Sequence, residues 1–492
     1  MSQPQQQVRT YGGWRRASSM GLFGLGPAQS ILVLAAITVP LFATAFGLFA
    51  LLATLVPSVL VLAALLLRWD GVPIIHALTR RVRWLAGANR AQARYRSGVM
   101  VDPRQAQTLP GVLAPTRLLP VADPGGGDFA VVWNARLGTM TAAVKVAATS
   151  TWLADPADAD TWVANWGQWL AGLGYQPMIR QAAVVVDTAP DPGSGLSAYM
   201  SRRIAPHGPP AAQRILRELV AASPAVAADV RTWVAITFHP AAAPSRPRGP
   251  AEAVTEIARV LPGLTEQLAG CGLSVLGRAT AAELASVVRY AYDPAARGLT
   301  DRLPEADLDP LRWAEAGPTA AVERWDSYRH DQAVSVSWAW HEAPRQQVPH
   351  NVLARLLNPG MYPKRVAWLW TPYTAGEAAR IVEHQRNVVA FRQQYARVKG
   401  RDETAREVED RQRASRAAEE EASGAGVGRL NLFVTTTVLD EGELPKAIAD
   451  VEAAADASKL RLRRLHAAQA AGFTATLPLG VMPYTLATHW PH

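Results

Sequence analysis

The chain has 492 residues, of which 49% are hydrophobic and 18% are charged. This composition excludes an intrinsically disordered protein and a membrane protein that is apolar throughout. The single cysteine, Cys271, excludes an internal disulfide framework and a zinc site built on cysteines. The net charge is +9, and all of it falls in residues 1–100, which contain ten arginines and one acid, Asp70. The neutral remainder argues against a broad nucleic-acid-binding face.

An uncharged stretch of 51 residues lies between Arg16 and Arg68. A bilayer core about 30 Å thick is crossed by about 20 apolar residues in an α-helix. The apolar part of the stretch is about twice that length, so it predicts a transmembrane helical hairpin over residues 29–67. We expect two spans, at about 29–47 and 49–67, with a turn near residues 46–48.

Arginines flank the predicted hairpin on both sides and indicate its orientation. They are Arg9, Arg15 and Arg16 before it, and Arg68, Arg80, Arg81 and Arg83 after it. By the positive-inside rule, both ends of the hairpin are expected in the cytoplasm. The prediction is therefore a protein of the cell (inner) membrane with cytoplasmic N- and C-termini and a cytoplasmic tail over residues 1–28. A signal peptide or a twin-arginine export signal is the alternative, but the apolar stretch is much longer than a signal peptide requires.

Residues 68–100 are predicted to form a basic amphipathic segment next to the membrane. Its apolar residues recur at helical spacing and are Ile74, Ile75, Leu78, Val82 and Leu85. Arg80, Arg81 and Arg83 occupy the other side of the same helix. Such a helix suits the anionic inner leaflet of a membrane. The alternative is a helix that packs on the soluble part of the chain.

From about residue 100 onward, strand patterns alternate with helix patterns, which predicts an α/β (α+β) fold. In the first half the expected elements are strand 140–148, helix 160–173, strand 182–187, helix 209–222, strand 232–238, a helix from 251 and strand 273–277. In the second half they are strand 334–340, helix 351–357, strand 364–371, strand 429–439, helix 443–456 and strand 459–466. We expect ferredoxin-like βαβ units in two cytoplasmic subdomains, residues 101–300 and 301–492.

A helical pair over residues 374–422 is expected to project from the second subdomain. The first helix, about 374–398, has one apolar seam, and residues 399–401 then interrupt it. The second helix, about 402–422, is almost wholly polar, with oppositely charged residues spaced to pair at i, i+4. A helix with so little to bury is either a solvated arm or the binding site of a partner.

The sequence contains no motif that predicts catalysis. None of the five lysines follows a glycine, so there is no Walker A loop for ATP. The glycine-rich segment 424–428 follows a helix and precedes a strand, which is the reverse of a dinucleotide-binding loop. The pairs His330-Asp331 and His341-Glu342 are adjacent on strands, so their side chains point to opposite faces.

We therefore predict no catalytic, cofactor-binding or metal-binding residues and no cofactor. Metal-binding histidine spacings are absent, and nothing in the sequence around Cys271 indicates an activated thiol. Trp162, Trp166 and Trp169 recur at helical spacing, which is typical of a core-facing helix rather than of a ligand site.

Four segments carry a resemblance to a known family: residues 94–99, 109–113, 162–170 and 325–331. They are similar to segments of EccE-like actinobacterial membrane proteins, a family named after a type VII secretion component with two N-terminal spans. The layout also resembles a PrgI-type membrane hairpin followed by the amino-terminal, motor-less portion of a conjugative ATPase. The resemblance implies a subunit of an inner-membrane secretion or conjugation translocon that works beside a separate ATPase.

The predicted function is a non-enzymatic structural subunit of such a translocon. Its expected partners are membrane lipid, a secretion-type ATPase, other translocon subunits and copies of itself, with no direct binding of nucleic acid. One alternative is a membrane-tethered enzyme whose site is assembled from scattered residues. The other alternative is a conjugation factor that contacts DNA.

Overall fold

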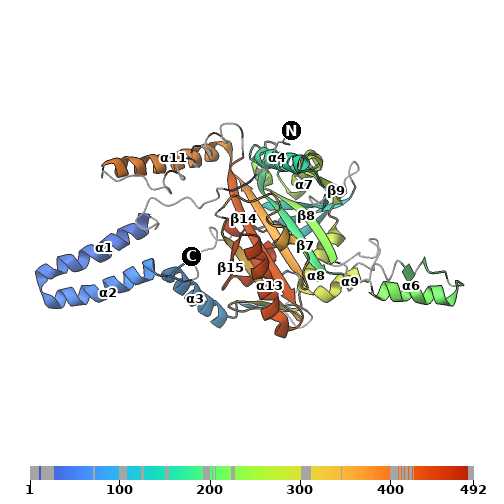
Figure 1. Cartoon of the computed structure of the whole chain (residues 1–492), viewed down its shortest axis with the longest axis horizontal. Coiled ribbons are helices and arrows are strands. Elements are labelled where there is room, and N and C mark those ends of the chain that lie inside the picture. The colour runs from blue at the N-terminus through green and yellow to red at the C-terminus, as the bar shows by residue number, and fades with distance from the viewer. Residues whose placement is uncertain are drawn as a thin grey trace, which may run out of the picture. The chain divides into compact units, whose positions relative to one another are not determined.

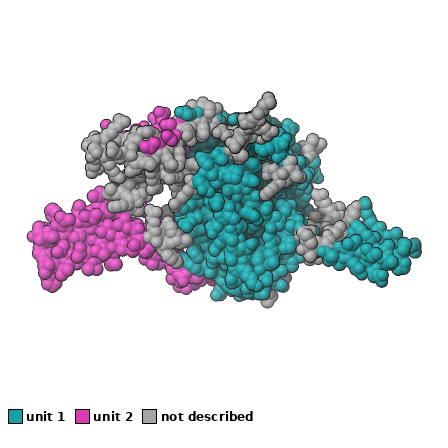
Figure 2. Space-filling view, in the orientation of Figure 1, with its two compact units in different colours: residues 1–13, 94–380, 418–492 teal, residues 14–93, 381–417 magenta. Residues whose placement is uncertain are grey.

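The computed structural model describes residues 10–12, 27–69, 72–98, 108–122, 127–149, 154–191, 200–222 except 202 and 206, 228–300, 312–344, 346–398 and 426–485, together with residues 408, 412, 415, 419 and 424. The chain divides into two compact units, shown in Figure 2. We call residues 1–13, 94–380 and 418–492 the sheet unit, and residues 14–93 and 381–417 the helical unit. Most of the predicted tail 1–28 lies outside the described residues.

Two apolar helices form a hairpin in the helical unit (Figure 1). Helix α1 spans Pro27–Ala43 and helix α2 spans Leu48–Leu66, with a 3-10 turn, η2, at Thr44–Phe46 between them. The chain reverses at Gly47, whose φ of +100° is a conformation that a side chain would strain. Both helices are long and apolar enough to cross a membrane, which confirms that the uncharged stretch forms two helices of that kind.

A short antiparallel ribbon connects the hairpin to a third helix. Strand β1 spans Arg68–Trp69, strand β2 spans Val72–Pro73, and helix α3 spans Ile74–Asn89. The start of α3 packs on the hairpin through an apolar cluster of Val33, Leu62, Leu65 and Ile75. Helix α3 therefore begins against the hairpin, and Figure 1 shows it at an angle to α2.

The sheet unit is built on one antiparallel sheet of 13 strands. Its strands from the first half of the chain are β3 (Arg94–Arg96), β4 (Thr116–Val121), β5 (Phe129–Asn134), β6 (Thr139–Ala148), β7 (Ile179–Pro190), β8 (Ala228–Phe238) and β9 (Leu273–Arg278). Those from the second half are β10 (Ala320–Glu323), β11 (Tyr328–His330), β12 (Ala333–Glu342), β13 (Lys364–Pro372), β14 (Gly428–Val438) and β15 (Arg461–Arg464). The mixed α/β class is confirmed, and the residues of both expected subdomains, 101–300 and 301–492, contribute to the same sheet.

The two halves repeat one topology. The first half has the spatial order β9-β6-β8-β7, with β5 and β4 beyond β6, and the second half has the order β15-β12-β14-β13, with β11 and β10 beyond β12. The halves meet through β7 and β13, which pair antiparallel from Lys364↔Thr188 to Trp370↔Ala182. Because the equivalent strands β7 and β13 pair antiparallel at the junction, an approximate two-fold axis relates the halves, as in a symmetric dimer.

Helices cover one face of this sheet. In the first half they are α4 (Pro156–Leu173) and α7 (Pro250–Glu266), and in the second half they are α10 (Ala354–Leu357) and α13 (Leu444–Ala457). Trp169 and Trp166 lie in the apolar cluster beneath α4, where their rings stack at 4.9 Å, in line with the expected core role of these two tryptophans. Trp162, of which the same was expected, is only half-buried and is not part of this cluster. Helices α6 (Pro210–Ala222) and α11 (Ala375–Val398) are inserted at the same point of each half, before β8 and before β14.

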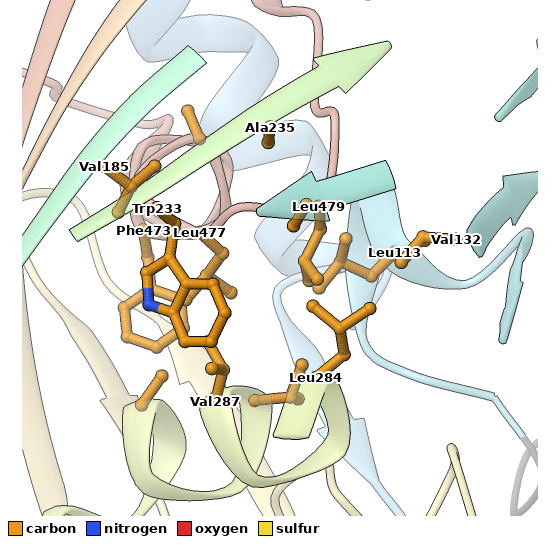
Figure 3. Packing of buried hydrophobic residues seen from close by; sticks show 14 of the residues in the cluster. Leu113, Val132, Val185, Trp233, Ala235, Leu284, Val287, Phe473, Leu477 and Leu479 are labelled. Carbon is orange, nitrogen blue, oxygen red and sulfur yellow. The ribbon is translucent and has the colours of Figure 1, made fainter. Parts of the chain in front are cut away.

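The opposite face carries the largest apolar cluster, shown in Figure 3. It lies between the sheet, helix α8 (Ala281–Tyr292) and the C-terminal segment that starts with helix α14 (Gln469–Ala475). Val287 of α8 lies against Trp233 of β8, whereas Leu284 of α8 points toward Leu113 and Leu479 (Figure 3). Leu477 and Leu479 belong to the C-terminal segment that continues from α14. The remaining described elements are helix α9 (Arg297–Thr300) and the 3-10 turns η3 (Gly111–Leu113), η5 (Pro240–Ala242), η6 (Gln267–Cys271), η7 (Pro294–Ala296) and η9 (Glu441–Glu443).

Several predicted bounds differ from the structure. The expected helix 351–357 is only the short α10, and the expected strand 459–466 is only β15. Helix α11 agrees with the first helix of the predicted pair, but its seam beyond Val382 and most of the second helix lie outside the residues whose side chains are described.

Candidate functional site

A buried ionic cluster lies at the junction between the two halves. We define it as Asp187 of β7, Asp229 and Arg231 of β8, Arg297 of α9 and Arg365 of β13. Arg297 Nη1 donates to both carboxylate oxygens of Asp187 at 3.2 and 3.1 Å, and its Nε donates to Asp229 Oδ2 at 2.8 Å. Arg231 Nη2 lies 2.8 Å from Asp229 Oδ2. Through Arg297, the cluster therefore links α9, which lies between the two halves in the chain, to strands β7 and β8 of the first half.

Arg365 brings the second half into this cluster. It is the register partner of Asp187 across the β7–β13 junction and is only 4% exposed. Its guanidinium carbon lies 4.6 Å from the centroid of the Phe473 ring, and its Nε donates to Thr476 Oγ1 at 3.4 Å. Its Nη2 is buried and forms no hydrogen bond with the described part of the chain.

Burial and charge act against each other in the cluster. Burial alone would raise the pKa of Asp229, but the charges of Arg297 and Arg231 outweigh it, so the pKa is lowered and the carboxylate is ionised. Burial lowers the pKa of the Arg365 guanidinium, while the charge of Asp187 opposes that change. Arg297 and Arg231 also stack over the ring of Tyr290, at 4.8 and 5.1 Å from its centroid. The cluster is therefore a buried network of ionised side chains.

His330, which the sequence marks beside an acid, lies in a second buried network. The side chain is fully buried, and its Nδ1 lies 2.5 Å from the carbonyl oxygen of Tyr292. A carbonyl can only accept, so Nδ1 carries the proton, and Nε2 accepts from Ser335 Oγ at 2.7 Å. Ser335 in turn lies 2.8 Å from Thr437 Oγ1. Burial lowers the pKa of His330 to about 3, so its imidazole is neutral and structural at neutral pH.

A ladder of hydroxyl groups crosses the central strands of both halves. In the second half, Ser337 and Thr435 lie 2.8 Å apart between β12 and β14. In the first half, Thr141 and Thr237 lie 3.0 Å apart between β6 and β8, which are the equivalent strands. The C-terminal segment covers both places, and at Gly480 a Cβ would come within 1.8 Å of Thr141 Oγ1. The C-terminal segment therefore packs against both halves and links them.

Asp331 and Cys271, which the sequence also marks, have local structural roles. Asp331 was expected on a strand but lies in the turn between β11 and β12, and its Oδ1 accepts from the backbone nitrogens of Thr319 and Ala320. The thiol of Cys271 lies 3.5 Å from the carbonyl oxygen of Gln267, and burial raises its pKa.

Two glycines of the segment 424–428 also have packing roles. A Cβ at Gly426 would come within 2.4 Å of Ala171, and one at Gly428 would come within 2.5 Å of Trp370. These glycines thus permit close packing of the connector. Within the described ranges, no group of three or more histidines, cysteines or carboxylates is placed to hold a metal ion.

The exposed apolar surface of the helical unit is the second candidate. Large side chains of α1 and α2 are open along both helices, and Phe49 is 92% exposed. The hydroxyls of Thr38 and Thr54 donate to carbonyls four residues earlier, Leu34 and Ala50, at 3.0 and 2.9 Å. Polar groups satisfied within their own helix are what a lipid environment requires. This surface has the properties of a membrane-facing hairpin.

Comparisons with known proteins add no family assignment. The sequence matches no protein-family model and no curated protein. Of the two candidates, the ionic cluster was not found from the sequence, because its five residues come from four separate elements and none stands in a motif.

Proposed function

We propose that the protein is a membrane-anchored, non-enzymatic subunit of a bacterial secretion or conjugation translocon. The observation that carries the proposal is the pair of exposed apolar helices α1 and α2, joined at a tight turn and followed by a large sheet unit. Leaving that much apolar surface in water would be costly, whereas a bilayer covers it. The segments similar to EccE-like proteins point to secretion as the process that such an anchor serves.

The proposed topology is two spans of the inner membrane with both termini in the cytoplasm. Arginines on both sides of the hairpin and the absence of acids beside them support this orientation. The sheet unit then lies in the cytoplasm, where a secretion ATPase operates. We assign to it the role of docking that ATPase, other translocon subunits and further copies of the chain.

We also propose that each half of the sheet unit is a ferredoxin-like unit. The order β-α-β-β-α-β along the chain, with spatial orders β9-β6-β8-β7 and β15-β12-β14-β13, supports this assignment for both halves. In such a unit the helices lie on one face of the sheet. Here the second face is occupied as well, because α8, α14 and the C-terminal segment cover it.

The non-enzymatic role is supported by the way in which the chemically capable groups are used. The ionic cluster is enclosed, and both ring nitrogens of His330 are engaged by Tyr292 and Ser335. Groups that are held in this way stabilise a fold and are not presented to a substrate. We therefore expect the protein to bind and position the other translocon subunits, while the separate ATPase supplies the chemical energy.

Two experiments test the proposal. The full chain should stay in the membrane pellet after alkaline carbonate extraction, and reporters fused to the two termini should both give cytoplasmic signals. Recovery of the intact chain in the soluble fraction, or reporters on opposite sides, would contradict the hairpin.

The translocon role is tested separately by co-purification from detergent-solubilised membranes. A secretion-type ATPase should accompany the tagged chain and should not accompany an unrelated tagged two-span protein from the same membranes. Recovery of the chain only as a lone monomer would contradict this role and leave the membrane hairpin standing.

A further inference from the structure

Helix α3 has a continuous apolar row that the structure leaves uncovered. Ile74, Leu78, Val82 and Leu85 follow one another at spacings of four, four and three residues, so they lie on one side of the helix. Their exposed fractions are 37%, 57%, 57% and 45%. At about 1.5 Å of rise per residue, the row extends over three turns. An exposed row of this length on a helix that also carries three arginines indicates a surface that meets an apolar phase.

The position of α3 identifies that phase. The backbone nitrogen of Ile74 donates to the carbonyl of Leu67 at 3.0 Å, directly after α2 ends. Ile75 belongs to the apolar cluster of the hairpin, and Gln29 and His76 lie within hydrogen-bond distance, 3.3 Å apart. Helix α3 thus starts at the level where α1 begins and α2 ends. If the hairpin spans a bilayer, this level is the boundary between the acyl chains and the headgroups.

The charges on α3 select the kind of lipid. Arg80 and Arg83 lie on the side of the helix away from the apolar row, whereas Arg81 lies beside the row, with its guanidinium carbon 5.2 Å from the centroid of the Trp84 ring. Residues 71–101 contain no acid. A helix with an apolar row and only positive charges is attracted to a surface that carries negative phosphate groups.

We propose that α3 is an in-plane interfacial helix that binds the anionic phospholipids of the inner leaflet. The apolar row enters the boundary of the acyl chains, Arg80 and Arg83 contact the lipid phosphates from the side that faces water, and Arg81 contacts them from beside the row. Helix α3 then fixes the depth at which the hairpin sits and the direction in which the chain leaves the membrane. This inference rests on the proposed function, because it requires the hairpin to be inserted.

A fluorescent label on single cysteines of the full chain tests the inference. In a Cys271→Ser background, the label is placed at Val82→Cys in the apolar row, at Arg83→Cys on the other side of α3, and at Val56→Cys in the middle of α2. The protein is reconstituted in vesicles of phosphatidylcholine and phosphatidylglycerol. A nitroxide on the acyl chains should quench the label at residue 82 several-fold more than the label at residue 83. Iodide in the buffer should show the opposite order.

The label at residue 56 separates the inference from the proposed function. If the nitroxide quenches the label at residue 56, the hairpin is inserted. If the label at residue 82 is then open to iodide, or if neither quencher reaches it, the proposal of an interfacial helix is wrong. If the label at 56 is itself open to iodide, both proposals fail.

Lipid selectivity is tested with the same label at residue 82. Lipid-phase quenching should fall when phosphatidylglycerol is replaced with phosphatidylcholine. The triple replacement of Arg80, Arg81 and Arg83 by glutamine should remove this dependence on lipid composition. Equal quenching of the unsubstituted helix in both kinds of vesicle would overturn the selectivity for anionic lipid.

Discussion

Replacing Asp187 with asparagine is expected to destabilise the sheet unit by about 3 kcal/mol, because the substitution leaves buried arginines without their carboxylate. Asp187 is 3% exposed and accepts two hydrogen bonds from Arg297. Arg365 is its register partner on β13 and is equally enclosed. After the substitution, three guanidinium groups remain in the cluster with Asp229 as their one carboxylate.

The magnitude follows from what the neutral side chain keeps and loses. Removing one partner of a buried ion pair costs about 3–5 kcal/mol, most of which is the penalty of the charge left behind. The amide oxygen of asparagine still accepts one hydrogen bond from Arg297, so we place the loss at the lower end of this range. A domain is stable by only about 5–15 kcal/mol, so a loss of this size is readily measured.

Urea unfolding of the full chain in detergent, followed by tryptophan fluorescence, provides the assay. Glu218→Gln on the exposed face of α6 is the control, and we expect it to change stability by less than about 0.5 kcal/mol. The double variant with Arg365→Gln should lose less than the sum of the single losses, because each substitution removes the charge that the other leaves unbalanced. The reasoning would be refuted if Asp187→Asn lowered the free energy of unfolding no more than the control does. Strict additivity with Arg365→Gln would refute an electrostatic interaction between Asp187 and Arg365 across the β7–β13 junction.

The remaining predictions concern the C-terminal segment, the buried histidine and the hairpin. Gly480→Ala places a Cβ against Thr141 at a backbone φ of +72°, so we expect a loss of about 2 kcal/mol or more in urea unfolding, whereas Gly376→Ala, which meets no atom within 4 Å, should be nearly neutral. The pKa of His330 is about 3 in the folded chain and 6.5 when unfolded, so its contribution is complete above pH 6.5 and declines as the pH falls toward 3. Between pH 7 and pH 5 this decline amounts to about 2 kcal/mol, and His330→Gln should lose this part of the acid sensitivity; an unchanged pH dependence would contradict the assignment. Leu55→Arg in the middle of α2 adds about 2.5–3.5 kcal/mol to the cost of insertion, so less protein should resist carbonate extraction than with Leu55→Val.

The helices of the hairpin and many elements of the sheet unit were predicted from the sequence, whereas α8 and α14 were missed. Helix α8 buries eight of its 12 residues, and the local signal of its start, the capping box of Thr280 and Glu283, was not recognised. Helix α14 has only seven residues, too few to show a period. The ionic cluster was equally hidden, because Arg297 and Asp187 lie 110 residues apart in the chain.

The two long apolar helices of the N-terminal region could be predicted from the amino-acid sequence, because the ability to cross a bilayer depends on length and composition within one continuous stretch. The central strands of both halves, β6 to β9 and β12 to β15, could also be predicted, because a period of two and a short apolar run are local properties, whereas β3, β4, β5, β10 and β11 were missed. The pairing of β7 with β13, through which the two repeated halves share one sheet, became known only from the folded chain. Many apolar strands could pair equally well with a given neighbour, and the choice is made by packing and buried charges that distant segments supply, such as Arg365 beside Asp187.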